Sequence, residues 1–170
     1  FAASHAGLAD AFSYLYMYIA ASAANLDAAD RNSLRALELD DTLAEAHASR
    51  GLALSLRRRH EEAEREFATA RALDPHLFEA PYFQARVFEL ADLPAVADVR
   101  GYGLLAGVDV RTKDGAPGLA GHEVQKRLFD AGLHLKATGD ALLLAPAFVA
   151  ERAHVDEMVG NQEVVVKNIG

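Results

Sequence analysis

The spacing of apolar residues changes near Leu90, and this change predicts two kinds of structure. Upstream of it, small and apolar residues recur every three to four positions, the period of amphipathic helices. Downstream, short apolar runs are separated by glycine-containing turns, which is typical of strands. We therefore predict an α+β chain in which helical hairpins are followed by a small β-α-β-β-α domain.

The first half is predicted to be helical throughout. The clearest helix covers 60–73, where Ala63, Phe67 and Ala70 lie on one face and Asp74-Pro75 ends the helix. A similar stretch lies about 34 residues earlier, which indicates a repeat of helix pairs. The helices predicted for this half cover residues 5–24, 27–39, 43–57, 60–73 and 78–90.

The second half is predicted to hold a three-stranded sheet flanked by two helices. Its strands are 99–110, 133–136 and 141–144, with a turn at 113–115 and a hairpin turn at 138–140. One helix covers 121–131, with Val124, Leu128 and Phe129 facing inward and Gly132 as the C-terminal cap. The other covers 150–159. These elements give three parts: a helical segment over 1–90, the small domain over 91–160 and a tail over 161–170.

Composition excludes several classes of function. The net charge of the 170-residue chain is −8 and no basic stripe is present, which argues against nucleic-acid binding. There is no cysteine, and the histidines do not have the spacing of a metal site, so no metal is predicted. The longest apolar stretch, 12–24, is too short to span a membrane. We expect a cytoplasmic protein that is processed or part of something longer, because it starts at Phe1 without an initiator Met.

The helical half resembles a known repeat family. Gly51, Ala63, Phe67, Ala70 and Pro75 match the tetratricopeptide repeat (TPR) in type and spacing. In this reading the small residues let the two helices of a repeat touch, and the phenylalanine fills the gap to the next repeat. The resemblance implies a helical-repeat segment that binds proteins or peptides, with departures such as an arginine at position 50 where leucine is usual.

The last helix of the repeat carries an aromatic cluster with two interpretations. It is either a core, or a partner-binding face left open because the expected next helix is missing. Other residues fall at positions that line the inner groove of such repeats. The partner-binding candidates are therefore Glu45, Phe78, Glu79, Tyr82, Phe83, Arg86 and Phe88.

The stretch from about Leu93 to Val159 resembles a different family, the C-terminal small domain of class III pyridoxal-phosphate-dependent aminotransferases. The ω-amino acid:pyruvate type is the nearest match. The motifs that carry the resemblance are Val99-Arg100-Gly101-Tyr102-Gly103-Leu104, Thr138-Gly139-Asp140, Leu144-Ala145-Pro146 and His154-Val155-Asp156-Glu157-Met158. Many members place an arginine for the substrate carboxylate four residues before the aspartate. Here that position is Lys136, which offers a point charge without a bidentate fork. The alternative is a strand lysine with its head in water.

No complete catalytic centre is predicted. The lysine that holds pyridoxal phosphate and its acid partner lie in the large domain of that family, which no segment of this chain resembles. We therefore predict no catalytic residue, no cofactor and no enzymatic activity. The predicted function is a non-catalytic protein–protein interaction or self-association module, a chimera whose partner is a protein, a peptide or a second copy in a dimer. The alternative is a fragment of a class III aminotransferase, a transferase that uses pyridoxal phosphate.

Overall fold

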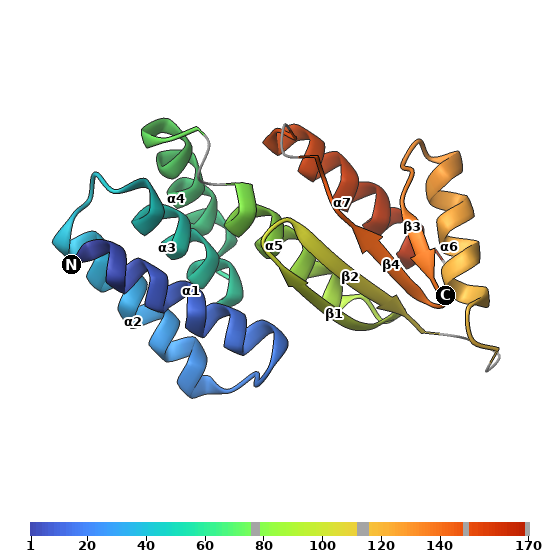
Figure 1. The fold of residues 1–170 in the computed structure, drawn as a ribbon, viewed down its shortest axis with the longest axis horizontal. Helices are drawn as coiled ribbons and strands as arrows, with labels where there is room; N and C mark the ends of the chain where they lie inside the picture. The colour runs from blue at the N-terminus through green and yellow to red at the C-terminus, as the bar shows by residue number, and fades with distance from the viewer. Residues whose placement is uncertain (76–78, 112–115, 148–149, 169–170) are drawn as a thin grey trace. The chain divides into compact units, whose positions relative to one another are not determined.

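The computed structural model describes residues 1–75, 79–111, 116–147 and 150–168, except for the side chains of Glu79, Ala80 and Tyr102. The chain divides into two compact units, Phe1–Ala85 and Arg86–Gly170 (Figure 1). The first is helical and the second combines helices with a sheet, so the predicted α+β class is confirmed at that level. The functional division into segments 1–90, 91–160 and 161–170 stays a prediction.

The first unit is built from paired helices (Figure 1). Helix α1 packs against α2, α3 packs against α4, and α3 also contacts α1 and α2. Small side chains allow this packing, since Ala6, Ala36 and Ala46 form a buried cluster between three of the helices. The bounds are α1 Ala2–Tyr18, α2 Ala23–Leu39, α3 Ala44–Leu56, α4 His60–Leu73 and α5 Glu79–Glu89, which continues into the second unit.

The boundary between α1 and α2 differs from the prediction. The apolar run predicts one helix that continues to residue 24. In the structure α1 ends at Tyr18, and α2 starts at Ala23. The Ser22 side chain accepts a hydrogen bond from the Asn25 backbone, which is the geometry of a helix N-cap. Ser22 therefore marks the start of a new helix within a segment that the hydrophobic pattern alone predicts to be one continuous helix. The predicted helix 60–73 is confirmed.

The close packing of α3 on α4 depends on one glycine. A Cβ atom placed on Gly51 would lie 2.7–2.9 Å from three ring carbons of Phe67, which is closer than real contacts allow. The Phe67 ring in turn meets Tyr82 of α5 edge-on, with ring centroids 5.2 Å apart. The predicted close approach of the two helices at Gly51 is therefore observed, whereas the role of Phe67 in filling the gap to a next repeat stays a prediction.

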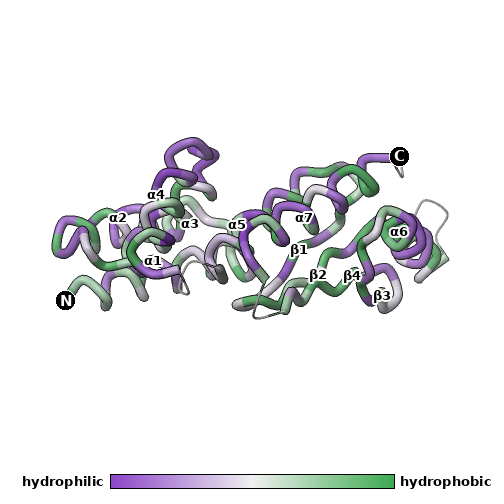
Figure 2. The backbone as a smooth tube through the Cα atoms, turned by 90° about the horizontal axis from the view of Figure 1, so that it is seen from above, coloured by the Kyte–Doolittle hydropathy of each residue, from purple (hydrophilic) through white to green (hydrophobic). Residues whose placement is uncertain are grey.

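The second unit contains an antiparallel sheet with α6 packed on it. The strand order is β1-β2-β4-β3, and α6 contacts β2, β3, β4 and α7. Figure 2 shows the hydrophobic runs of β2 and β4 next to each other at the centre of the sheet. The bounds are η1 Leu90–Asp92, β1 Val96–Tyr102, β2 Leu105–Val110, α6 Leu119–Asp130, β3 Lys136–Thr138, β4 Ala141–Leu144 and α7 Arg152–Lys167.

In the described part of the chain, the sheet has four strands where we predicted three. The run 99–110 is not one strand but a hairpin, because the chain turns at Gly103, whose φ of 56° lies in the left-handed region. The strand predicted at 133–136 lies instead at Lys136–Thr138. The predicted hairpin turn at 138–140 is confirmed. The predicted turn at 113–115 lies outside the described residues.

Both helices of this unit differ in part from the prediction. Val124 and Leu128 of α6 are buried as expected, but Phe129 is 62% exposed, so its predicted inward position is wrong. The predicted cap at Gly132 is confirmed. Its φ is 89°, its own backbone N–H donates to the oxygen of Phe129, and the N–H of Leu133 donates to the oxygen of Leu128, which is the Schellman pattern. Helix α7 continues to Lys167 through residues that we assigned to a tail.

Candidate functional site

The predicted partner-binding residues differ widely in exposure. Tyr82 and Phe83 are 1% and 0% exposed, so these two aromatic side chains lie in the core and present no surface to a partner. Glu45 is exposed in the first turn of α3. Phe78 lies outside the described residues, and the side chain of Glu79, the first residue of α5, is not described.

Arg86 and Phe88 lie further along α5 and are partly exposed. Arg86 is ion-paired with Glu89 one turn later, and its Nε lies 3.3 Å from a carboxylate oxygen of Asp156 in α7. These contacts join α5 to α7 within the second unit. A role in partner binding for these residues, and for Glu45, stays a prediction, as does the predicted dimer.

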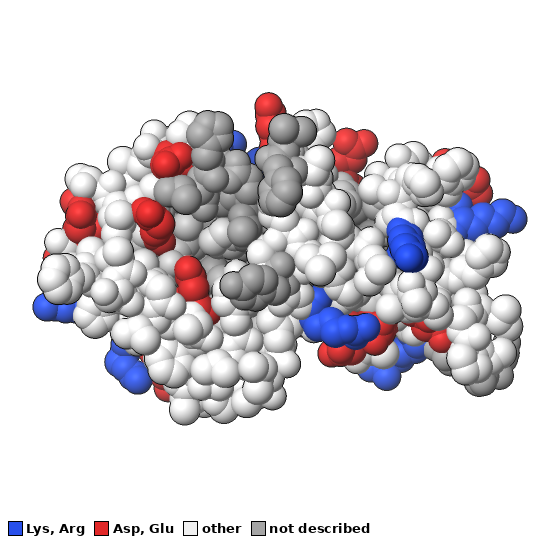
Figure 3. Space-filling model, in the orientation of Figure 1, with Lys and Arg blue, Asp and Glu red and all other residues white. Residues whose placement is uncertain are grey.

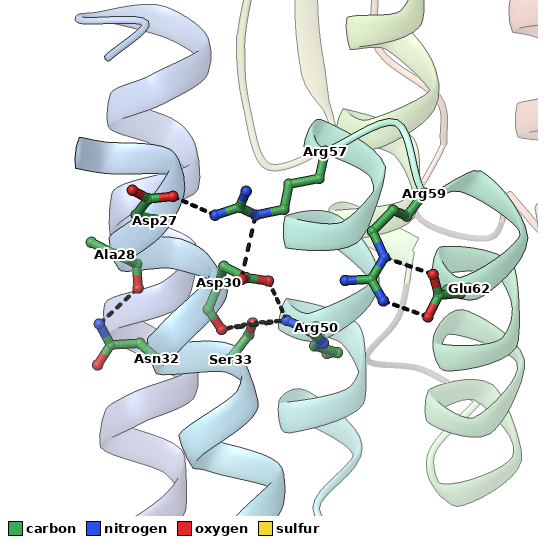
Figure 4. Close-up of polar contacts among 9 residues, drawn as sticks. All are labelled: Asp27, Ala28, Asp30, Asn32, Ser33, Arg50, Arg57, Arg59 and Glu62. Atoms are coloured by element: carbon green, nitrogen blue, oxygen red, sulfur yellow. Dashed lines mark hydrogen bonds and ion pairs between the residues drawn. The ribbon is translucent and has the colours of Figure 1, made fainter. Parts of the chain in front are cut away.

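Polar side chains, of which Arg50 and Ser33 are buried, link α2 to α3 in the first unit (Figure 4). Arg50 is only 8% exposed, and its Nη1 donates to Asp30 Oδ1 at 2.6 Å and to Ser33 Oγ at 3.2 Å. Arg57 adds an ion pair with Asp27 at 2.5 Å. The repeat resemblance predicts a leucine at position 50 and therefore an apolar contact between α2 and α3. The contact that Arg50 makes there is polar.

One face of the sheet in the second unit carries the candidate substrate residue. Lys136 of β3 lies directly opposite Leu143 of β4, which in turn lies opposite Gly107 of β2. Arg100 of β1 lies opposite that glycine. Directly opposed residues in a sheet have their side chains on the same face. The ammonium of Lys136 and the guanidinium of Arg100 therefore belong to one face, separated by the width of two strands.

The two cations on this face have different surroundings. Arg100 forms two hydrogen bonds with the carboxylate of Asp109, at 2.6 and 3.0 Å, and another with Asp98 at 3.0 Å. The hydrogen bonds to Asp109 are the main reason that the pKa of Arg100 is raised. Lys136 is exposed, and no ion pair or hydrogen bond joins it to another described side chain. Lys136 is therefore the more accessible cation for an anionic ligand.

The turn that follows Lys136 is tied to the start of α6. Asp140 accepts hydrogen bonds from the backbone nitrogens of Gly118, at 2.9 Å, and Gly121, at 3.0 Å. Gly118 is the N-cap residue of α6 and has no side chain of its own to cap the helix. The carboxylate of Asp140 therefore satisfies two N–H groups at the positive end of the helix dipole.

A second contact ties α6 to the residue just before Lys136. The side-chain amide of Gln125 donates to the backbone oxygen of Leu135 at 2.9 Å. Sequence reasoning missed both Gln125 and the capping role of Asp140. The signal for the latter was the glycine pair at 118 and 121 at the start of a helix that has no capping side chain of its own.

The charge distribution and the arrangement of possible metal ligands indicate no further candidate site among the described residues. On the face seen in Figure 3, acidic and basic side chains are interspersed, with no continuous basic patch among the described residues. In the described part of the chain, no group of three His, Cys, Asp or Glu side chains is arranged to hold a metal ion. None of the described helices is both long enough and apolar enough to cross a bilayer.

In sequence and fold, the chain is similar to class III pyridoxal-phosphate-dependent aminotransferases. One relative is the omega-aminotransferase of Caulobacter vibrioides, which is 41% identical over 78 residues, 46% of this chain and 18% of the relative. A solved structure described as a transaminase with L-ala is 31% identical to this chain, with a TM-score of 0.52. The match covers 71% of this chain and 28% of the transaminase chain. No family model matches the chain, so no family model supports the TPR resemblance.

These findings correct the predicted function. The predicted non-catalytic interaction module is wrong, because the relatives and the solved structures are aminotransferases. The alternative, a fragment of a class III aminotransferase, fits them better. The chain spans about a fifth of the length of the curated relatives it matches.

The prediction of no cofactor is also corrected, since the similarity is to a family that uses pyridoxal phosphate. A PLP-bound aminotransferase mutant from Vibrio fluvialis shares the fold, with a TM-score of 0.50 over 64% of this chain and 26% of its own at 21% identity. The residues described here do not fit the cofactor by themselves. Lys126, Lys136 and Lys167 are all exposed, whereas attachment of this cofactor needs a lysine in a shielded pocket beside an acid for the pyridine nitrogen.

Proposed function

We propose that this chain is part of a pyridoxal-phosphate-dependent aminotransferase of the ω-amino acid:pyruvate type, and that residues 86–168 correspond to its small domain. The observation that carries the proposal is the 41% identity over 78 residues to an omega-aminotransferase. The cofactor would supply the amino-transfer chemistry. In this proposal it is held by residues outside those described here.

Lys136 is the residue that we propose for substrate binding. It is exposed on the sheet face described above and has no described partner, so its ammonium is available to a substrate carboxylate. A lysine makes a point-charge contact with a carboxylate, whereas an arginine makes two parallel hydrogen bonds. We therefore expect carboxylate-bearing amine donors to bind less tightly here than in relatives with arginine, and donors without a carboxylate to be affected less.

A graft tests this function. The matching segment of the Caulobacter enzyme is replaced by the corresponding residues of this chain, and transamination with pyruvate is measured. We expect measurable turnover. In the active graft, Lys136→Ala should raise the KM of a carboxylate-bearing donor by roughly tenfold, the size of one charge-assisted hydrogen bond. The KM of a carboxylate-free amine should stay unchanged, and Lys136→Arg should lower the first KM.

A second graft provides the matched control. The same segment is taken from the putrescine–pyruvate aminotransferase of Pseudomonas aeruginosa, which is 33% identical to this chain over 88 residues. If that graft is active and the graft from this chain is folded but inactive, residues 86–168 are not an aminotransferase small domain. Equal effects of Lys136→Ala on both donors would exclude its proposed contact with the carboxylate.

For the first unit we propose a TPR-type arrangement of α1–α4 and assign it no function. The proposal is supported by the helix pairs and by the approach of Gly51 to Phe67. A polar link at Arg50 replaces the usual leucine contact. Family-model searches with homologues of residues 1–85 would test it, and a consistent match to another helical family would exclude it.

A further inference from the structure

We propose that Asp140 and Gln125 are positioning residues that fix Lys136 at the edge of the sheet. The inference rests on the proposed function of Lys136 as the carboxylate contact. Neither side chain needs to touch the substrate. Each connects helix α6 to the backbone on one side of Lys136, so that together they determine where its ammonium can reach.

Strand β3 has little to hold it otherwise. It is three residues long, Lys136–Thr138, and lies at the edge of the sheet, where β4 is its one partner strand among the described residues. Edge strands of this length make few ladder hydrogen bonds and open easily. Lysine side chains are also flexible, with rotatable bonds along a four-carbon stem. A defined position of the ammonium therefore requires that the backbone of β3 be fixed by contacts outside the sheet.

The two contacts flank Lys136 closely. Gln125 binds the oxygen of Leu135, the residue immediately before it. Asp140, four residues after it, binds Gly118 and Gly121 at the start of α6. Both side chains are partly buried, and the three hydrogen bonds have lengths of 2.9–3.0 Å. Helix α6 is anchored by its buried Val124 and Leu128, so it offers a rigid support for the short strand.

The backbone at this junction is built for close approach. A Cβ atom on Gly121 would lie 2.1 Å from the oxygen of Gly139 and 2.8 Å from Cα of Asp140. Gly139 itself has a φ of 60°, which favours glycine. Any side chain at position 121 would therefore push the β3–β4 turn away from α6. The backbone of the β3–β4 turn therefore packs directly against the backbone of α6, with no side chain between them.

The test measures amide hydrogen exchange in the full chain. Gln125→Met removes the donor but keeps the length of the side chain, and Lys126→Met makes the same replacement at an exposed neighbour as a matched control. We expect Gln125→Met and Asp140→Ala to increase exchange at residues 136–138 by roughly tenfold relative to the control. Exchange at Val108 in the central strand β2 should stay unchanged. Equal increases at both places would show general destabilisation and overturn the proposal.

The active graft provides the second readout. Both variants should raise the KM of a carboxylate-bearing donor by roughly fivefold, with kcat and the KM of a carboxylate-free amine unchanged. Asp140→Asn keeps one acceptor oxygen, so it should raise the KM of the carboxylate-bearing donor less than Asp140→Ala does. Parallel losses with both donors would overturn the positioning role. If the graft is folded but inactive while the Pseudomonas control works, the proposed function fails, and hydrogen exchange alone decides whether α6 fixes β3.

Discussion

Asp10 shows how a single side chain can make the stability of the first unit depend on pH. It lies on α1 next to Ser49 of α3, and burial raises its pKa from 3.8 to about 6, a rise that the serine only partly opposes. Oδ1 has no hydrogen-bond partner among the described residues. The folded chain therefore holds the Asp10 proton over a range of pH in which the unfolded chain has lost it.

The direction of the effect follows from that difference. Between about pH 4 and pH 6 the folded state binds more protons, so the free energy of unfolding falls as the pH rises. We expect Asp10→Asn to remove this slope and to stabilise the chain at pH 7.5, by about 3 kcal/mol at most. Urea unfolding at pH 4.5 and 7.5 measures both quantities.

A matched control for this prediction is Asp130→Asn. Asp130 is exposed at the end of α6, so its replacement makes the same change of side chain outside the core. If Asp10→Asn and the unchanged chain had the same slope between pH 4.5 and 7.5, Asp10 would not retain its proton on folding.

At the scale of helices and strands, local signals in the sequence were more informative than the hydrophobic pattern alone. Asp74-Pro75 and Gly132 correctly ended helices because proline and left-handed glycine have strict backbone requirements. The hairpin at Gly103 was missed, since glycine in a strand also fits a bend. Phe129 was misplaced because helical periodicity does not distinguish the edge of a buried face from its centre.

The candidate site could be predicted only in part, for a similar reason. Lys136 was found from a motif, four residues before an aspartate. The partners of that aspartate lie 22 and 19 residues away, and the bond of Gln125 spans 10 residues to a backbone oxygen. Contacts of this kind leave no pattern in local sequence, because backbone atoms are the same at every position.

Two helical glycines give a paired prediction about packing. Gly51→Ala places a methyl group against the Phe67 ring and should destabilise the chain by about 1–3 kcal/mol. Gly7→Ala lies in α1, where nothing is within 4 Å of the new methyl group, and should stabilise it by about 0.5–1 kcal/mol. Thermal unfolding of both variants tests the pair. A stabilising Gly51→Ala would show that α3 and α4 are not in close contact.

For the whole chain, the exposure of its described lysines predicts how it responds to the cofactor. Lys126, Lys136 and Lys167 all lie in solvent, so none offers a shielded place of attachment. We expect the purified chain, mixed with equimolar pyridoxal phosphate and dialysed, to retain no absorbance above 400 nm. The active graft, treated in the same way, should retain it. A stoichiometric band in the chain alone would show that it holds the cofactor without a large domain.

The capping of α6 by Asp140 also bears on how the second unit folds. The N-terminus of this helix is completed by a residue that joins it only once the β3–β4 hairpin has formed. A 12-residue helix without a cap is marginal in water. Helix and hairpin should therefore form together during folding, and nascent chains that end before residue 140 should leave α6 frayed at its first turn.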